Sequence, residues 1–163
     1  MNMIANAPPI IVTDPPGAPP ITGQLNAGSF WPCIDVTKLR ETVDVDGSVT
    51  AARLTHAAAN ALASVIQDLS AWAQTQMAAG LTTLADVPAV TINGTSVNVL
   101  RFERAVYAYT KADLIERYAG ADATGRAERG DEGRELQASE YRADALRAVR
   151  DILGVARMES ELI

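Results

Sequence analysis

Apolar residues recur at helical spacing in three long stretches of the chain, which predicts a mainly α fold. The longest stretch extends from Ser48 to Ala79, about 32 residues or roughly 48 Å of helix. Its packing stripe repeats at spacings of four and three and consists of Ala58, Leu62, Val65, Leu69, Trp72 and Gln76. Serine is a good N-cap and glycine readily adopts the left-handed conformation that closes a helix. We therefore expect Ser48 to begin this helix and Gly80 to end it.

Two further helices are expected on the C-terminal side. The first runs from about Ser96 to Ala119 and carries a wide apolar arc, which suits the central helix of a bundle. Its stripe consists of Val99, Phe102, Val106 and Tyr109. The second runs from about Glu135 to Ala156, and the glycine-rich and charged residues 120–133 before it are interpreted as a solvated loop. Asp113 and Arg117 are spaced for an exposed i,i+4 ion pair.

Capping residues predict two shorter elements. Asp35 or Thr37 can cap a short helix that ends at about Glu41. Thr83 can cap a single helical turn, which Pro88 stops. Together with the longer stretches, these signals predict a small bundle of about four helices, one of them long.

Residues 91–99 allow two interpretations. Apolar and β-branched residues flank Asn93-Gly94, a dipeptide typical of hairpin turns, so a small hairpin is one of them. In the other, Asn93-Gly94 is a simple turn and Thr95 or Ser96 caps the next helix. We favour the second interpretation.

The start of the chain has a different character. Seven of the eight prolines lie within the first 32 residues, and Asp14 is the only charged residue before Asp35. Because proline breaks helices and favours extended backbone, residues 1–34 are predicted to form an extended arm. The remaining residues divide into a helical bundle domain, 35–157, and a short C-terminal tail, 158–163.

Both ends of the chain are apolar, and exposed apolar surface usually marks a contact with another molecule. We therefore expect the arm to lie on a partner or on a neighbouring subunit. Aromatic side chains often dominate interfaces, so Phe30 and Trp31 are the preferred contact residues. Leu162 and Ile163 are secondary candidates in the C-terminal tail.

The composition favours close helix packing and argues against several classes of function. Apolar residues make up 48% of the chain but aromatic residues only 5%, so the core must be built largely from small side chains. The formal net charge of −6 disfavours a protein that binds nucleic acid by neutralising phosphates. Residues 15–34 carry no charge, but their five prolines would break a membrane-spanning helix, so no membrane partner is expected.

Residues that could support catalysis or bind a metal are few. His56 is the single histidine and has no metal-ligating residue three or four positions further along its predicted helix. Cys33 is the single cysteine, lacks a basic neighbour in sequence and is expected to serve packing. Asp131, Glu132 and Glu135 alternate with arginines and are interpreted as surface charge. We therefore expect no enzyme, no metal site and no cofactor.

Several short motifs carry a resemblance to a known family. They are Ala79-Gly80-Leu81-Thr82-Thr83-Leu84-Ala85-Asp86-Val87-Pro88, Ile92-x-Gly94-x-Ser96, Glu103-Arg104-Ala105-Val106 and Glu116-Arg117-Tyr118. In order and spacing they resemble the head completion (head stabilisation) proteins of contractile-tailed temperate phages. The specific part of the resemblance covers Ala79–Tyr118, and the organisation is similar from Asp35 to Ile163.

The resemblance implies a structural head–tail connector. Such a protein would form a ring, of twelve copies, beneath the portal after DNA packaging, seal the head and dock the tail. Its partners would be further copies of itself, the portal protein above and a tail terminator or neck protein below, and double-stranded DNA would pass through the lumen without specific binding. The protein would reside at the virion neck, after assembly in the host cytoplasm. The alternative from the residues alone is a small intracellular helical adaptor or regulatory module that binds one protein partner.

Overall fold

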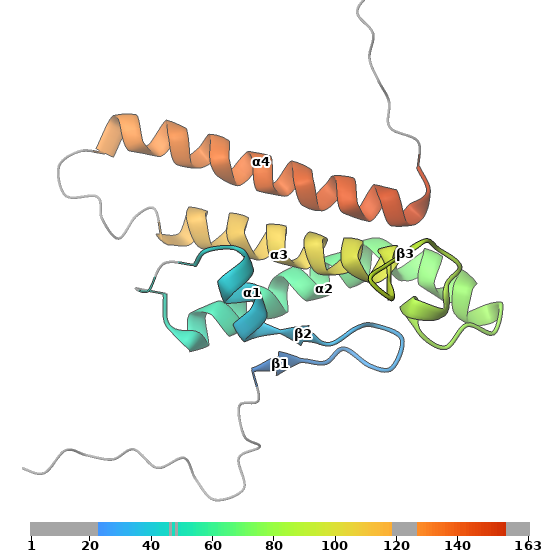
Figure 1. The fold of residues 1–163 in the computed structure, drawn as a ribbon. Helices are drawn as coiled ribbons and strands as arrows, with labels where there is room; N and C mark the ends of the chain where they lie inside the picture. The colour runs from blue at the N-terminus through green and yellow to red at the C-terminus, as the bar shows by residue number, and fades with distance from the viewer. Residues whose placement is uncertain (1–22, 46, 48, 119–126, 156–163) are drawn as a thin grey trace, which may run out of the picture.

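The computed structural model describes residues 23–45, 47, 49–118 and 127–155 of the 163-residue chain. This part of the chain confirms the mainly α fold class and contains four helices, a 3₁₀ turn and two short hairpins (Figure 1). The helices and the turn are α1 Val36–Thr42, α2 Ala51–Ala78, η1 Leu84–Asp86, α3 Val97–Tyr118 and α4 Ala127–Leu153. The sequence predicted one long helix, whereas α2 has 28 residues and α4 has 27.

Helix α3 lies at the centre of the bundle, between α2 and α4, and runs antiparallel to α4 (Figure 1). Alanines buried on α3 and α4 are Ala105, Ala108, Ala112, Ala138, Ala145 and Ala148. Small side chains allow two helices to approach closely. The buried alanines of α3 and α4 therefore favour close packing of these two helices. An ion pair between Arg142 of α4 and Glu116 of α3 also joins them, with 2.6 Å between Nη2 and Oε2.

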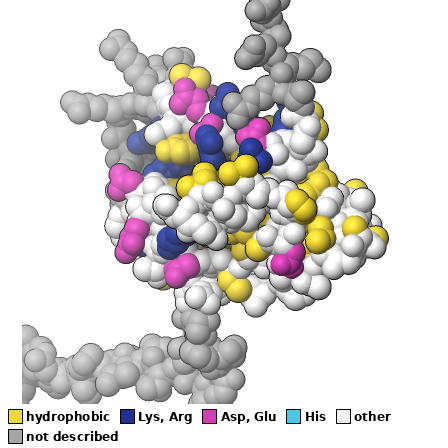
Figure 2. Space-filling model, turned by 45° about the vertical axis from the view of Figure 1, so that its right-hand side comes forward, with side chains coloured by type: hydrophobic (Ala, Val, Ile, Leu, Met, Phe, Trp, Pro, Cys, Tyr) yellow, Lys and Arg dark blue, Asp and Glu magenta, His cyan; other side chains and the backbone are white. Residues whose placement is uncertain are grey.

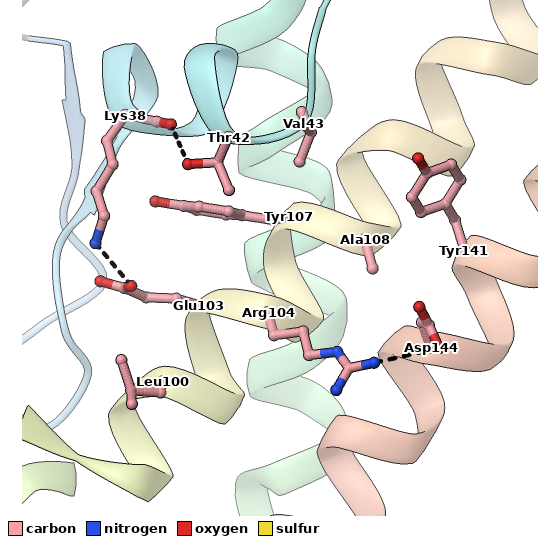
Figure 3. A pocket seen from close by; sticks show the side chains of 10 residues that line it. All are labelled: Lys38, Thr42, Val43, Leu100, Glu103, Arg104, Tyr107, Ala108, Tyr141 and Asp144. Atoms are coloured by element: carbon pink, nitrogen blue, oxygen red, sulfur yellow. Dashed lines mark hydrogen bonds and ion pairs between the residues drawn. The ribbon is translucent and has the colours of Figure 1, made fainter. Parts of the chain in front are cut away.

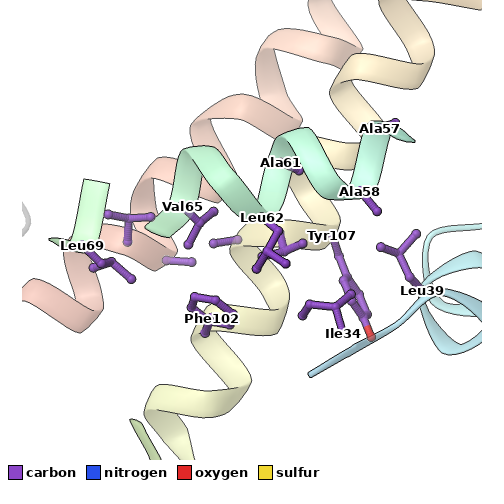
Figure 4. Close-up of a cluster of buried hydrophobic side chains, with 14 of the residues drawn as sticks. Ile34, Leu39, Ala57, Ala58, Ala61, Leu62, Val65, Leu69, Phe102 and Tyr107 are labelled. Carbon is purple, nitrogen blue, oxygen red and sulfur yellow. The ribbon is translucent and has the colours of Figure 1, made fainter. Parts of the chain in front are cut away.

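The larger core side chains lie between α2 and α3. The stripe predicted on α2 is buried at its first four positions, which are Ala58, Leu62, Val65 and Leu69. Trp72 and Gln76, the last two positions, are half-buried. Phe102 of α3 is fully buried and lies beside Leu62 (Figure 4). The helical periodicity therefore identified the face of α2 that packs against α3.

Side chains cap the N-termini of α1 and α2. Asp35 was one of the two predicted caps of α1, and its Oδ1 accepts hydrogen bonds from the amides of Thr37 and Lys38 at 2.8 and 3.0 Å. Helix α2 begins later than predicted, because its N-cap is Thr50, whose hydroxyl accepts from the Arg53 amide at 3.3 Å. Ser48, the predicted cap, lies outside the described residues.

A hairpin at the start of the described chain moves the boundary that the sequence placed after residue 34. Strand β1, Gln24–Leu25, pairs antiparallel with β2, Ile34–Asp35. The loop between them returns to the body, where the carbonyl of Phe30 accepts from the amide of Leu84 at 2.8 Å. Residues 24–34 therefore pack on the helical body, and only residues 1–22 of the predicted arm lie outside the described residues.

The connection between α2 and α3 contains the predicted helical turn and a hairpin. Gly80 closes the end of α2 with a φ of +90°, as predicted. Thr83 caps the single turn η1 and forms a reciprocal capping box with Asp86. A hairpin then pairs β3, Thr91–Ile92, with β4, Thr95–Ser96, and α3 starts directly after it. The hairpin interpretation of residues 91–99 is therefore correct, although we favoured the other.

Helix α4 starts earlier and ends earlier than predicted. It covers Ala127–Leu153 instead of residues 135–156, so the second half of the predicted loop 120–133 is helical. Gly154, with a φ of +71°, follows its last residue and accounts for the early end. The predicted ion pair between Asp113 and Arg117 is present on α3, with 2.7 Å between Oδ1 and Nε.

Candidate protein-interaction surfaces

The first candidate surface is at one end of the bundle, where the end of α2, the β3–β4 hairpin and the end of α4 meet. A hollow of about 440 Å³ lies here, lined by residues near the end of α2, by residues 87–90 before the hairpin, by the start of α3 and by the end of α4. The segments that meet here also carry exposed large apolar side chains, and we call this group the apolar end: Met77, Val90, Ile92 and Val155. Figure 2 turns this end of the molecule forward and shows hydrophobic side chains gathered toward its right-hand edge.

The local structure of the hairpin explains why its apolar side chains stay exposed. Each of its strands has two residues, and Asn93 and Gly94 form the turn with φ values of +52° and +79°. The amide of Val97 donates to the carbonyl of Val90 at 2.8 Å, which fixes the hairpin to the start of α3. Val90 is 73% exposed and Ile92 is 52% exposed, although both could have contributed to a core. Clustered exposed apolar side chains of this kind mark contact surfaces on other proteins.

The second candidate surface is a groove between α1, α3 and α4, with a volume of about 410 Å³. Tyr107 of α3 lies on its α1 side and Tyr141 of α4 on the other, with the small Ala108 between them (Figure 3). Leu100 and Val43 add apolar surface to its walls. We refer to this feature as the tyrosine groove.

The charged side chains of the tyrosine groove pair with one another. Lys38 Nζ lies 2.9 Å from Glu103 Oε2, and Arg104 Nη2 lies 3.4 Å from Asp144 Oδ1 (Figure 3). Each pair joins two helices, and all four side chains are at least partly exposed. Exposed pairs of this kind contribute little stability, roughly 0–1 kcal/mol each. Their main effect is to leave the groove without a net charge.

Tyr107 is the most perturbed titratable group that the structure describes. Its side chain is buried, and its hydroxyl has no hydrogen-bond partner in the described part of the chain. Burial, followed by the negative charges of Glu103 and Asp35, raises the pKa of this phenol to about 12. Tyr107 therefore stays protonated at neutral pH, and no described residue accepts a hydrogen bond from its buried hydroxyl.

The residues considered for chemistry are dispersed. His56 is exposed on α2, where its Nδ1 lies 3.4 Å from the Asn60 amide nitrogen. Cys33 is exposed and free, which corrects its assignment to packing. The side chains of Asp131 and Glu132 are outside the described set. Among the described residues, no three His, Cys, Asp or Glu side chains cluster to hold a metal ion, and no helix is long and apolar enough to cross a membrane.

Phe30 and Trp31, the predicted contact residues, lie on the helical body and not in an extended arm. Phe30 is 5% exposed and belongs to the core, so its side chain has almost no surface left for a partner. Trp31 is half-buried, with its ring stacked on Phe102 at a centroid distance of 5.1 Å. Leu162 and Ile163 lie outside the described residues.

Sequence reasoning did not select the exposed side chains of the apolar end. A signal was nevertheless present, because Val90 and Ile92 stand close to the Asn93-Gly94 turn. A side chain next to a tight turn in a short hairpin has few neighbours that could cover it.

This fold defines a small helical protein whose most distinctive surfaces are suited to contacts with other proteins. The family model of the phage head completion protein (GPL) matches residues 25–163, and the chain belongs to this family of structural phage proteins. It is also similar to the head completion/stabilization protein of Escherichia phage P2, with 34% identity over 148 residues, covering 91% of this chain and 86% of the relative. Family membership implies association with the virion. No solved structure matches the chain significantly.

The extent of the family match agrees with the structural boundary. The match begins at residue 25, within β1, and not at residue 35, where the sequence placed the start of the body. The β1–β2 hairpin is thus part of the family fold. Residues 1–24 lie outside the family match.

Proposed function

We propose that this chain is a head–tail connector, which forms a ring of twelve copies beneath the portal after DNA packaging. In that position it seals the filled head and presents a docking surface for the tail. Its partners are the neighbouring copies, the portal protein above and a tail terminator or neck protein below. Copies assemble in the host cytoplasm and remain at the neck of the virion.

The observation that carries this proposal is the apolar end in a chain that belongs to a head completion family. Val90 and Ile92 are exposed at a hairpin that the hydrogen bond from the Val97 amide to the Val90 carbonyl joins to the start of α3. Burying one large aliphatic side chain contributes about 1.5–3 kcal/mol. If every subunit of a ring makes this contact, the small contributions add up to strong binding of the whole ring.

The charge of the chain supports a role beside a DNA conduit. The formal net charge is −6, so the chain as a whole repels the phosphate backbone. A ring of such subunits lets double-stranded DNA pass through its lumen without specific binding, since adhesion by phosphate neutralisation requires basic side chains. A basic inner surface in the assembled ring would contradict this step.

A matched pair of substitutions tests whether the apolar end is a contact surface. Ile92→Lys places a charge on the hairpin, and Leu146→Lys makes a similar change on α4, outside the apolar end, at a leucine that is 49% exposed. Both side chains are exposed, so both variants are expected to keep the fold, which far-UV circular dichroism and urea unfolding check.

The variants are then supplied to a phage that lacks its head completion protein, and infectious particles and DNA-filled heads are counted. We expect Ile92→Lys to lower the yield of infectious particles strongly and Leu146→Lys to leave it near the unsubstituted level. Equal incorporation of the two variants would refute the role of the apolar end. Mixing the protein with portal rings and imaging the product tests the ring itself, since an added layer without twelve-fold symmetry would contradict the proposed copy number.

A further inference from the structure

The N-terminal segment, residues 1–22, contains a repeated motif whose chemistry fits the tyrosine groove. The sequence Ala-Pro-Pro-Ile occurs at residues 7–10 and again at residues 18–21. Proline-rich sequences favour the polyproline II conformation, which leaves their backbone carbonyls without internal partners. Such segments are recognised by grooves lined with aromatic side chains. We propose that the tyrosine groove of one copy binds the motif at residues 7–10 of a second copy of this chain.

The shape of the groove fits a short proline segment. Tyr107 and Tyr141 stand on opposite sides of the small Ala108 (Figure 3). Tyr107 is only 6% exposed, so the half-buried ring of Tyr141 provides most of the aromatic surface. The volume of about 410 Å³ lies within the range of small-ligand pockets, about 300–1,000 Å³. Leu100 provides apolar surface for the isoleucine that ends the motif.

The charges in the groove and in the segment are also compatible. The groove pairs Lys38 with Glu103 and Arg104 with Asp144, so it holds no unpaired charge that would select a charged ligand. Asp14 is the only charged side chain in residues 1–22 and lies outside both motifs. An uncharged apolar segment can therefore bind without breaking an ion pair.

The position of the first motif along the chain favours a second copy as the source of the ligand. Each N-terminal segment carries two motifs, and they differ in their distance along the chain from the body. The motif at residues 18–21 ends two residues before Gly23, whose carbonyl accepts from the Val36 amide at the start of α1. The other motif precedes it by eleven residues, or about 34 Å of polyproline II helix at roughly 3.1 Å per residue, enough to reach a neighbouring subunit.

This inference rests on the proposed function, because the ring is what holds a neighbouring groove within reach. It also gives the proline-rich segment a mechanical role. A segment that binds the next subunit adds a second link to each interface, and linked contacts strengthen one another through effective concentration.

Disulfide trapping in the full-length protein tests the proposal without phage or portal. Cys33 is replaced by serine, and one variant then carries Ile10→Cys in the motif while a second, differently tagged variant carries Leu100→Cys in the groove. The two are mixed at high concentration under mild oxidation, and the mixed dimer is measured on non-reducing gels. Two controls use Leu146→Cys instead of the groove cysteine and Ile4→Cys instead of the motif cysteine.

We expect the pair that joins the motif to the groove to form the mixed dimer several-fold faster than either control pair, because a disulfide requires the two Cβ atoms to approach within about 4.5 Å. Leu146 is more exposed than Leu100, so accessibility alone would favour the control. Equal rates in all pairs would overturn the proposal.

A chain that carries both Ile10→Cys and Leu100→Cys gives the second decisive outcome. If its disulfide closes within one chain faster than between chains, the motif occupies its own groove and the assignment to a second copy is wrong. Loss of infectivity in Ile92→Lys, by contrast, concerns only the apolar end. The proposed function and the role of the groove can therefore fail separately.

Discussion

Two N-terminal deletions distinguish the described hairpin from a dispensable arm. Removing residues 1–22 takes away none of the described core, so the free energy of unfolding should stay close to that of the full chain. Removing residues 1–32 also deletes β1, Phe30 and Trp31. This longer deletion is expected to be strongly destabilising, although the sequence alone assigned all of these residues to an arm.

The structure gives the expected magnitude for the longer deletion. Phe30 is 5% exposed, and truncating a buried phenylalanine costs about 3–5 kcal/mol. Phe30 also packs edge-on against Trp31, with 5.0 Å between ring centroids, and such a contact adds about 0.5–1.5 kcal/mol. Leu84 is fully buried, and its amide would lose the carbonyl of Phe30 as its acceptor. A loss of at least about 4 kcal/mol is a large part of the roughly 5–15 kcal/mol that stabilises an ordinary domain.

Urea unfolding followed by far-UV circular dichroism measures both deletions on the same helical signal. With an m-value of about 2 kcal/mol per molar urea, the longer deletion should lower the midpoint by about 2 M. The substitution Phe30→Ala in the full chain serves as a control, because it removes the side chain and keeps the backbone contact with Leu84. If the chain that begins at residue 33 unfolds at the same urea concentration as the full chain, the hairpin does not belong to the cooperative fold and this reasoning is refuted.

Two further predictions concern single side chains. The phenol of Tyr107, with its pKa raised to about 12, favours the folded state while protonated, so its contribution is present below pH 10 and is lost as the pH rises toward 12. Tyr107→Phe should therefore make the free energy of unfolding less sensitive to pH in this range. At pH 7 the substitution should not destabilise the protein, because the hydroxyl has no hydrogen-bond partner among the described residues. A clear loss of stability at pH 7 would contradict this. Thr50→Ala should cost about 1 kcal/mol in urea unfolding, because it removes the N-cap of α2. Thr55→Ala is its control, since that hydroxyl bonds only to a carbonyl of its own helix; equal effects of the two substitutions would show that capping is unimportant.

Local rules predicted the features of the fold that depend on local interactions. Asp35, Gly80 and Thr83 act where the sequence placed them, because a cap or a left-handed closure depends on neighbours within a few residues. The buried stripe of α2 was visible for the same reason, since helical spacing alone brings its members to one face. The bundle itself was therefore predictable.

Hydrophobic periodicity did not predict the start of α4. Hydrophobic periodicity detects a helix only where large apolar residues recur, and residues 127–133 contain none. Alanine, glutamate and arginine in this stretch favour helix by intrinsic propensity, which a search for apolar stripes does not count. Gly130 and Gly133 also favoured the prediction of a loop, but both lie within α4 in the structure.

Which apolar side chains are buried and which stay exposed depends on interactions between distant parts of the chain. The sequence placed Phe30 in an arm because prolines surround it, but a proline at position 32 is compatible with the loop between β1 and β2. Phe30 belongs to the buried core, and its carbonyl accepts from the amide of Leu84, which lies 54 positions away in the sequence. Ile92 shows the converse, since its short hairpin supplies no covering neighbour and it stays 52% exposed. An apolar residue beside a tight turn is thus a better candidate for an intermolecular contact than an aromatic residue beside prolines, because the turn itself limits how many of the chain's own residues can cover it.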